Sequence, residues 1–255
     1  MSRPKGNLQP TPLATRLGRW ALALLVLGVM VGGGAWGTLW LLTPQNVPLE
    51  KVRIDGEIRH TRREVLQHTL AGRISGSFFS LDLDGVRTAV EELPWVTEAS
   101  VRRVWPNTLL VQVHEREALA RWGERGVVSP EGEVFIPDPG TVPGGLARLA
   151  GPDGSAEEVV EKYKWARERA AGGGFGITRL ELSERHAWRL ELEGEMDVHL
   201  GNRDADARFE RVLAHLPRLR EDGAVQRIDA RYANGFAVQW RPGQEPPSAQ
   251  AAAEE

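Results

Sequence analysis

The 255-residue sequence contains no cysteine, and only two tyrosines and three methionines. The absence of cysteine excludes disulfide bonds, metal sites built on thiolates and cysteine nucleophiles. Any domain of this chain outside the cytoplasm must therefore be held together by its hydrophobic core, without the disulfides that many exported domains use. The roughly 200 residues in the C-terminal four-fifths of the chain are enough for such a core, and their number favours two domains.

Charged residues are absent from residues 20–42, a run of 23 positions that reads WALALLVLGVMVGGGAWGTLWLL. As a helix rising about 1.5 Å per residue, this run spans roughly 35 Å, enough to cross a hydrocarbon core of about 30 Å with some tilt. Backbone polar groups in lipid must be satisfied within the segment, so the run is expected to be a transmembrane helix. Trp20 and Trp40, near its two ends, suit the headgroup level on either side.

Acidic residues are absent before Glu50, whereas four cations precede the apolar run: Arg3, Lys5, Arg16 and Arg19. This asymmetry predicts a cytoplasmic tail at residues 1–19 and places the chain from residue 43 onward outside the cytoplasm. A cleaved signal peptide is the alternative. Such a signal has an apolar core of about 7–15 residues followed by a small-x-small site, whereas this core is longer and no A-x-A follows it. A mature chain beginning near residue 43 would favour the signal peptide.

Net charge argues against two classes of partner. The whole chain carries −3, so residues 20–255 carry −7 once the four N-terminal cations are set aside. An acidic exported part does not favour binding to nucleic acid or a polybasic contact with a membrane surface.

Patterns that carry catalysis or metal binding are missing from the exported part. The six histidines show neither H-E-x-x-H nor a pair at ligand spacing on one helix, and no serine lies in G-x-S-x-G. A G-x-G-x-x-G match at residues 32–37 lies inside the apolar run, where it fits either small-xxx-small helix packing or the ordinary glycine content of membrane helices. We therefore expect no enzyme activity, no cofactor and no metal.

Residues 49–117 are predicted to form a β-α-α-β-β unit. Alternation over 49–54 indicates a strand, which Gly56 ends. A capping box at residues 61–64 and an i, i+3, i+4, i+7 pattern at 86–93 predict two helices. Strands at 95–104 and 108–114 follow, with a turn at Trp105-Pro106-Asn107 between them. This order gives a small α+β domain with its helices on one face of a short sheet.

Residues 118–240 are predicted to form a β-rich α+β domain. A capping box at residues 155–158 opens a helix to about residue 171, and an apolar face around Phe209 predicts a second helix that ends or kinks at Pro217. The last two strands are joined around Asn234-Gly235, a strong hairpin dipeptide. Residues 241–255 have almost no large apolar residue and are predicted to be a disordered tail. The expected strands are 127–128, 134–136, 146–149, 177–183, 188–192, 197–200, 225–230 and 235–240.

Tryptophan is unusually frequent, with nine copies. Five outside the apolar run are expected to fill the two cores: Trp95, Trp105, Trp122, Trp165 and Trp188. Trp240 ends the last predicted strand, directly before the tail, and is expected near a sheet edge.

Several segments in order resemble the bacterial cell-division family FtsQ, called DivIB in Gram-positive bacteria. The first of these are Leu93-Pro94-Trp95-Val96, Ala99-Ser100-Val101-Arg102, Trp105-Pro106-Asn107-Thr108-Leu109 and Val113-His114-Glu115, in this order behind the apolar run. Further similar segments lie at 77–82, 119–122, 151–155 with Tyr163, and 228–240, so the resemblance covers residues 20–240. The sequence departs from the family pattern at Ala118, where proline is frequent, and at Ser129, where aspartate is frequent.

The resemblance implies a POTRA domain at 49–117 and a β-rich domain at 118–240 in a single-pass inner-membrane protein at the division septum. It also implies a non-enzymatic scaffold of the divisome that binds the FtsB–FtsL coiled-coil pair in the periplasm by β-strand addition. Other division proteins are possible partners of the POTRA domain. Carried over by position, the FtsB contact falls on the last strand and the residues before it: Arg231, Tyr232, Gly235, Phe236, Val238 and Trp240.

Alternatives remain within this interpretation. A strand sends alternate side chains to opposite faces, so Phe236 and Val238 could enter the core while only Tyr232 and Trp240 touch the partner. Another POTRA-bearing assembly or secretion protein would show several POTRA repeats or barrel strands, and one copy without barrel strands is found here. An envelope hydrolase would need a catalytic constellation in the exported part.

Overall fold

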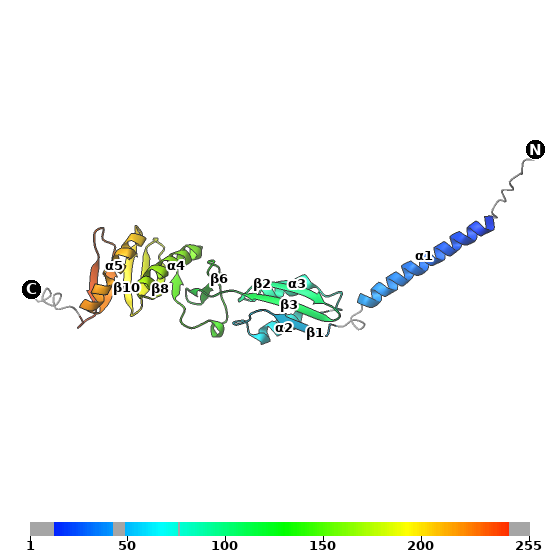
Figure 1. Cartoon of the computed structure of the whole chain (residues 1–255), viewed down its shortest axis with the longest axis horizontal. Coiled ribbons are helices and arrows are strands. Elements are labelled where there is room, and N and C mark those ends of the chain that lie inside the picture. The colour runs from blue at the N-terminus through cyan, green and yellow to red at the C-terminus, as the bar shows by residue number, and fades with distance from the viewer. Residues whose placement is uncertain (1–12, 43–48, 76, 245–255) are drawn as a thin grey trace, which may run out of the picture. The chain divides into compact units, whose positions relative to one another are not determined.

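The structure is a computed structural model that describes residues 13–42, 49–75 and 77–244 (Figure 1). The predictions for residues 1–12 and for most of the C-terminal tail lie outside these residues. The chain divides into two compact units. The first holds the chain up to Gly56 together with Glu64–Val90 and Ala99–Val113, and the second holds Glu57–Arg63, Glu91–Glu98 and the chain from His114 onward.

The N-terminal element is helix α1, Leu13–Leu42. It begins seven residues before Trp20, so part of the predicted tail is helical. The stretch Gly18–Trp40 is long and apolar enough to cross a membrane, and none of its side chains is buried. Trp20 and Met30 are each 72% exposed. Leaving so much apolar surface in water is unfavourable, which fits the predicted membrane span.

A three-stranded sheet and two helices confirm the predicted β-α-α-β-β order. Strand order is β1-β3-β2, with β1 parallel to β3. The helices bury Leu66, Leu70, Val86 and Val90, and β3 buries Leu109, Val111 and Val113. These side chains lie at helical and at alternate spacing respectively, as one core-facing side requires. Leu110 is also buried, on the other face of β3. The elements are β1 Lys51–Asp55, α2 Arg63–Arg73, α3 Leu83–Glu91, β2 Val96–Val104 and β3 Thr108–Glu115.

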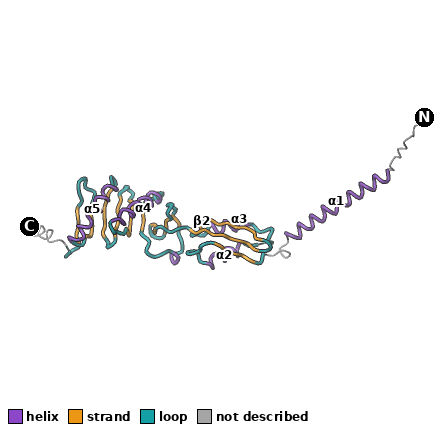
Figure 2. The backbone as a smooth tube through the Cα atoms, viewed as in Figure 1, coloured by secondary structure: helices purple, strands orange, loops and turns teal. Residues whose placement is uncertain are grey.

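The second sheet has nine strands in the order β12-β11-β10-β9-β8-β7-β4-β5-β6. Helices α4 and α5 pack on one side of it (Figures 1 and 2), where Val160, Tyr163, Phe209 and Leu216 join one buried cluster. The strands are β4 Ala120–Trp122, β5 Gly126–Val128, β6 Val134–Phe135, β7 Arg148–Ala150, β8 Ile177–Leu182, β9 Trp188–Leu192, β10 Met196–Gly201, β11 Val225–Asp229 and β12 Ala237–Trp240. The helices are η1 Pro139–Thr141, α4 Ala156–Gly172 and α5 Ala205–Asp222.

Neither predicted capping box forms. Helix α2 begins at Arg63, and the carboxylate of Glu115 accepts the backbone N–H groups of Arg59, His60 and Thr61 just before it. Ser155 makes no side-chain cap bond to α4, because its hydroxyl donates to the carbonyl of Pro152 at 2.6 Å. At the first box Glu115 accepts the N–H of Thr61 that the motif would use, and at the second the Ser155 hydroxyl is directed to Pro152 instead of to α4.

Three further details of local structure differ from what the sequence indicated. Helix α5 does not end at Pro217 but continues five residues past it, where Leu219 still packs against the core. β4 occupies residues that the alternation of the sequence did not indicate as a strand. Trp105 is 79% exposed instead of buried, because it lies in the turn between β2 and β3. Trp95 and Trp188 are buried as expected, and Trp122 and Trp165 are partly buried.

Candidate partner-binding edge

Strand β12 lies at one end of the nine-stranded sheet, so Trp240 is at a sheet edge as the sequence predicts. It pairs with β11 in antiparallel register, from Asp229 opposite Ala237 to Val225 opposite Trp240. β11 is its one strand neighbour among the residues that the structure describes. An edge of this kind leaves alternate N–H and C=O groups without a ladder partner.

The direction of those free groups follows from one hydrogen bond. The N–H of Arg241, next after β12, donates to the carbonyl of Ala224 at 2.8 Å and so points toward β11. N–H groups alternate between the two edges of a strand. The N–H groups of Trp240 and Val238 therefore point outward, away from β11. The register shift between Val225 and Arg227 places the extra residue in β11, so it does not interrupt this alternation in β12.

The side chains of β12 alternate as a strand requires. Val238 and Trp240 are partly buried against the main core cluster, as is Phe236 just before the strand, whereas Ala237 and Gln239 are exposed. Phe236 meets His215 of α5 edge to face at 5.5 Å between ring centroids. Trp240 thus shares the helix side of the sheet with Phe236 and Val238, and is not grouped with Tyr232. The exposed parts of these three side chains lie at the edge of the sheet that β12 forms.

The connection from β11 to β12 is a seven-residue loop at 230–236 and not the predicted tight turn at Asn234-Gly235. A two-residue type I′ turn needs positive φ at both central residues, and neither of these has it. Tyr232 in this loop is 59% exposed. Gly235 has open space around it, since a Cβ built there meets no atom within 4 Å.

Arg231 is fixed at the start of this loop. Its guanidinium donates twice to the carboxylate of Asp229, at 2.8 Å and 2.6 Å, and its backbone N–H donates to the same carboxylate at 3.1 Å. The side-chain bonds from Arg231 are the main reason that the pKa of Asp229 lies below its usual value. Sequence reasoning did not single out Asp229, although its i, i+2 spacing from Arg231 is a pattern that could have indicated the pair.

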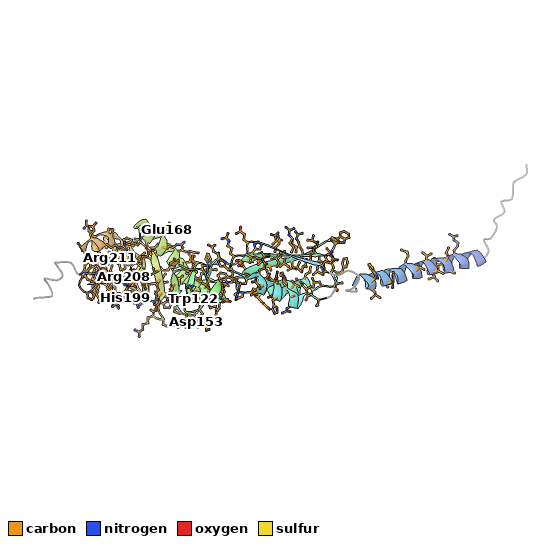
Figure 3. The ribbon with its side chains drawn as sticks, turned by 90° about the horizontal axis from the view of Figure 1, so that it is seen from below. Trp122, Asp153, Glu168, His199, Arg208 and Arg211 are labelled. Carbon is orange, nitrogen blue, oxygen red and sulfur yellow. The ribbon has the colours of Figure 1, made fainter. Side chains whose placement is uncertain are left out.

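The sheet face opposite the helices carries a second charged cluster that steadies β9, β10 and β11. Asp197 accepts from Arg189 at 2.7 and 2.8 Å, from Arg227 at 3.2 Å, and contacts the ring of His199 at 3.0 Å (His199 is labelled in Figure 3). Burial raises the pKa of Asp197, but the hydrogen bonds from Arg189 and His199 outweigh it and leave the pKa lowered. These contacts hold the strand on which β11, and hence β12, is built.

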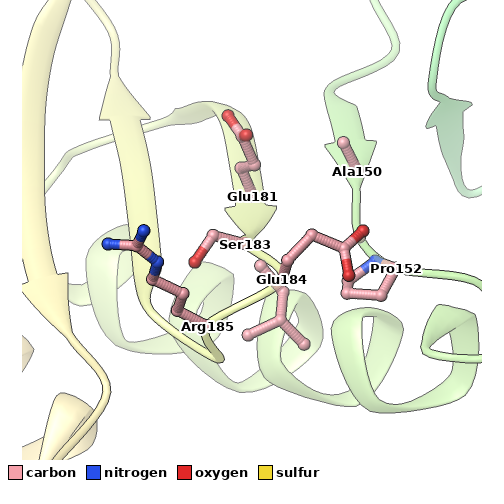
Figure 4. Close-up of a pocket in the computed structure, with 8 residues that line it drawn as sticks. Ala150, Pro152, Glu181, Ser183, Glu184 and Arg185 are labelled. Carbon is pink, nitrogen blue, oxygen red and sulfur yellow. The ribbon is translucent and has the colours of Figure 1, made fainter.

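A shallow cavity of about 400 Å³ lies beside β8, lined by Pro152, Glu184 and Arg185 among others (Figure 4). Its one hydroxyl nucleophile candidate, Ser183, accepts the backbone N–H of Ala187 at 3.1 Å and so holds the β8–β9 turn. In residues 13–42, 49–75 and 77–244, no group of three or more His, Asp or Glu side chains is placed to hold a metal ion. In this cavity the Ser183 hydroxyl is thus bound to backbone and not to a basic side chain.

Two family models match the chain in succession. The FtsQ-type POTRA domain matches residues 47–116, and the C-terminal domain of the cell division protein FtsQ/DivIB matches residues 120–231. The second match ends at Arg231 and so does not reach β12.

Relatives that match most of the chain carry the same family name as the two models. The cell division protein FtsQ of Allochromatium vinosum is 38% identical over 231 residues, which cover 90% of this chain and 92% of that protein. The FtsQ of Burkholderia pseudomallei is 39% identical over 225 residues, covering 86% and 88%. The FtsQ of Coxiella burnetii is 34% identical over 207 residues, covering 80% and 85%.

Proposed function

The chain belongs to the FtsQ/DivIB family of bacterial cell-division proteins, and on that premise we propose that it is a non-enzymatic scaffold that binds the FtsB–FtsL coiled-coil pair by β-strand addition to β12. Family membership itself makes the chain a component of the divisome. The proposal adds the partner, the site and the mode of binding.

The unpaired edge of β12 is the observation that carries the proposal. A partner strand lying beside β12 would accept hydrogen bonds from the outward N–H groups of Val238 and Trp240 and donate to outward carbonyls. It would also cover the apolar surface that Phe236, Val238 and Trp240 leave exposed at the end of the sheet. Main-chain bonds then supply affinity, and these side chains supply selectivity.

The loop before β12 adds polar and aromatic contacts. Tyr232 has a large exposed surface and a hydroxyl, and Arg231 is held in place by Asp229 rather than free to rotate. Tyrosine, tryptophan and arginine are the residue types that most often anchor protein interfaces. Gly235 leaves room for a partner backbone to approach the loop closely.

We place this site in the periplasm, at the division septum, with the N-terminus in the cytoplasm. The single apolar helix α1 fits a single-pass membrane protein, and the four cations before it, with no acidic residue before Glu50, favour this orientation. The domain limits proposed for the exported part remain 49–117 for the POTRA domain and 118–240 for the β-rich domain.

Alanine substitutions test the site. Tyr232→Ala and Trp240→Ala are each expected to weaken binding of the full-length chain to purified FtsB–FtsL by more than about 1 kcal/mol, roughly fivefold, as measured by calorimetry. Ile136→Ala is the matched control, since Ile136 is an exposed apolar residue just beyond β6 at the other end of the sheet. Unchanged affinity of variants that remain folded would remove Tyr232 and Trp240 from the site.

A further inference from the structure

Trp105 is the most exposed large apolar residue of the chain described by the structure, at 79%. It lies in the turn between β2 and β3, on the sequence Trp105-Pro106-Asn107. A tryptophan usually buries most of its large ring, and a ring left in water forgoes that stabilisation. Neither the sheet of its own unit nor the proposed β12 site explains why a tryptophan occupies this turn.

The turn lies beside the start of β1, the first strand after the apolar helix α1. The carbonyl of Asn107 accepts the backbone N–H groups of Glu50 and Lys51, at 3.1 and 3.3 Å. The side chain of Asn107 also donates to the carboxylate of Glu50 at 2.5 Å. Because β1 is parallel to β3, the start of β1 and the β2–β3 turn share one end of the sheet.

A second exposed aromatic residue is fixed at the same end. Arg103, two residues before Trp105, donates through its guanidinium to the carbonyls of Phe78, Phe79 and Leu81 at 2.6 to 3.1 Å. These bonds hold the loop after α2 beside the end of β2. Phe78 is buried, but Phe79 is 42% exposed. Trp105 and Phe79 are therefore two exposed aromatic residues at the same end of the sheet, and we call them the aromatic tip. Lys51 and Glu50 are also exposed at this end.

Chain length restricts what this tip can reach. Eight residue steps separate Leu42, the last residue of α1, from Glu50, which is bonded to Asn107. Even fully extended, eight residues span at most about 26–29 Å. The aromatic tip is thus tethered close to whichever surface α1 leaves, at a high effective concentration.

We propose that the aromatic tip, Trp105 with Phe79, rests in the lipid headgroup region of the membrane that α1 spans. The proposal rests on the membrane anchor proposed above, and not on the β12 site. Indole rings favour the headgroup level, because it accommodates both an apolar ring and an N–H donor. The contact would give the first unit a second attachment to the bilayer and limit its orientations about the linker.

Tryptophan fluorescence of the full-length chain in nanodiscs tests the proposal. Trp20, Trp36 and Trp40 are first replaced by phenylalanine, which keeps the apolar helix, and a further Trp105→Phe variant isolates the emission of Trp105 by difference. Lipids brominated near the headgroup are expected to quench most of this emission, and aqueous iodide is expected to quench little of it. Phe79→Glu should restore emission at Trp105, whereas Ile136→Glu, on the other unit, should not.

Separate results identify separate failures. A version that retains Trp40 reports on the anchor, and the absence of lipid quenching at Trp40 would overturn the anchor and the tip contact together. Quenching at Trp40 without quenching at Trp105 would overturn the tip contact alone. Shielding of Trp105 from both quenchers would show that protein, and not lipid, covers the tip, which also overturns the proposal.

Discussion

Proline at Val238 is a sharp test of strand addition, because it removes one outward N–H of β12 and leaves the hydrogen bonds to β11 in place. Proline is tolerated on an edge strand when its missing N–H faces away from the neighbouring strand. The partner carbonyl that would have accepted this N–H then stays buried without a donor. Losing that bond costs about 1–3 kcal/mol, so FtsB–FtsL affinity should fall by roughly 5- to 150-fold.

Val238→Ala is the control for this change. It trims a partly buried side chain but keeps the N–H. The alanine variant therefore measures the effect of lost packing by itself, and the difference between the two variants measures the effect of the missing N–H. Binding of each full-length variant is measured by calorimetry, and retention of the fold is checked by the thermal transition. Equal affinity for the proline and alanine variants, with both folded, would show that the outward N–H of β12 makes no bond to the partner and would refute strand addition at this edge.

Two further predictions concern the first sheet and the start of α2. Gly56 has φ +124°, and a Cβ there would lie 2.2 Å from the carbonyl oxygen of Val113. Gly56→Ala should therefore lower the free energy of unfolding by about 2 kcal/mol or more in urea titrations. The matched Gly72→Ala, in helix α2 with open space around it, should raise the free energy of unfolding by about 0.5–1 kcal/mol, and similar losses for both variants would contradict the steric argument. Burial raises the pKa of Glu115, but hydrogen bonds from Thr61, Arg59 and His60 outweigh it, so the pKa is lowered and the ionised form stabilises the fold. That stabilisation is complete above the unfolded pKa of 4.5 and is lost as pH falls through the lower folded pKa. Glu115→Gln should therefore destabilise the chain by about 1–3 kcal/mol at pH 7, with a deficit that shrinks at acidic pH. A pH-independent deficit would contradict the role of the charge.

Periodicity predicted the elements that are long and one-sided. The β-α-α-β-β order followed from apolar residues spaced to bury one side, and Leu66, Leu70, Val86 and Val90 do so. The apolar helix α1 was predicted differently, from composition over 23 residues. Such signals come from many residues at once, so one exceptional position does not erase them.

Predictions that depended on a single side chain were less successful. Ser155 and Thr61 each matched the capping-box motif. In the structure the Ser155 hydroxyl bonds the carbonyl of Pro152, and the N–H of Thr61 bonds the carboxylate of Glu115. Glu115 lies more than fifty residues from the backbone groups it binds, and no local pattern could indicate that pairing. Trp105 was expected in a core because tryptophan is usually buried, but its position in the β2–β3 turn leaves its side chain exposed.

The candidate site was predicted only in part. Resemblance located the segment, and the placement of β12 at the end of the sheet required the strand order. The grouping of Trp240 with Val238 and Phe236 required the register with β11. The clamp between Asp229 and Arg231 depends on side-chain geometry that sequence spacing permits but does not specify.

The two ends of the nine-stranded sheet are not equivalent, and this difference favours β12 as the binding edge. At the opposite end, β6 consists of Val134–Phe135 alone, and prolines at 137 and 139 follow it. A two-residue edge offers few outward groups, and the prolines remove donors just beyond it, which are ordinary ways to prevent strand addition. β12 has twice the length and carries no proline within it, and its first neighbouring proline is Pro242. Under the proposed function, a partner strand would therefore find a usable ladder at β12 and not at β6. A bound complex should then lose affinity on substitution at β12 and remain insensitive to substitution at Val134.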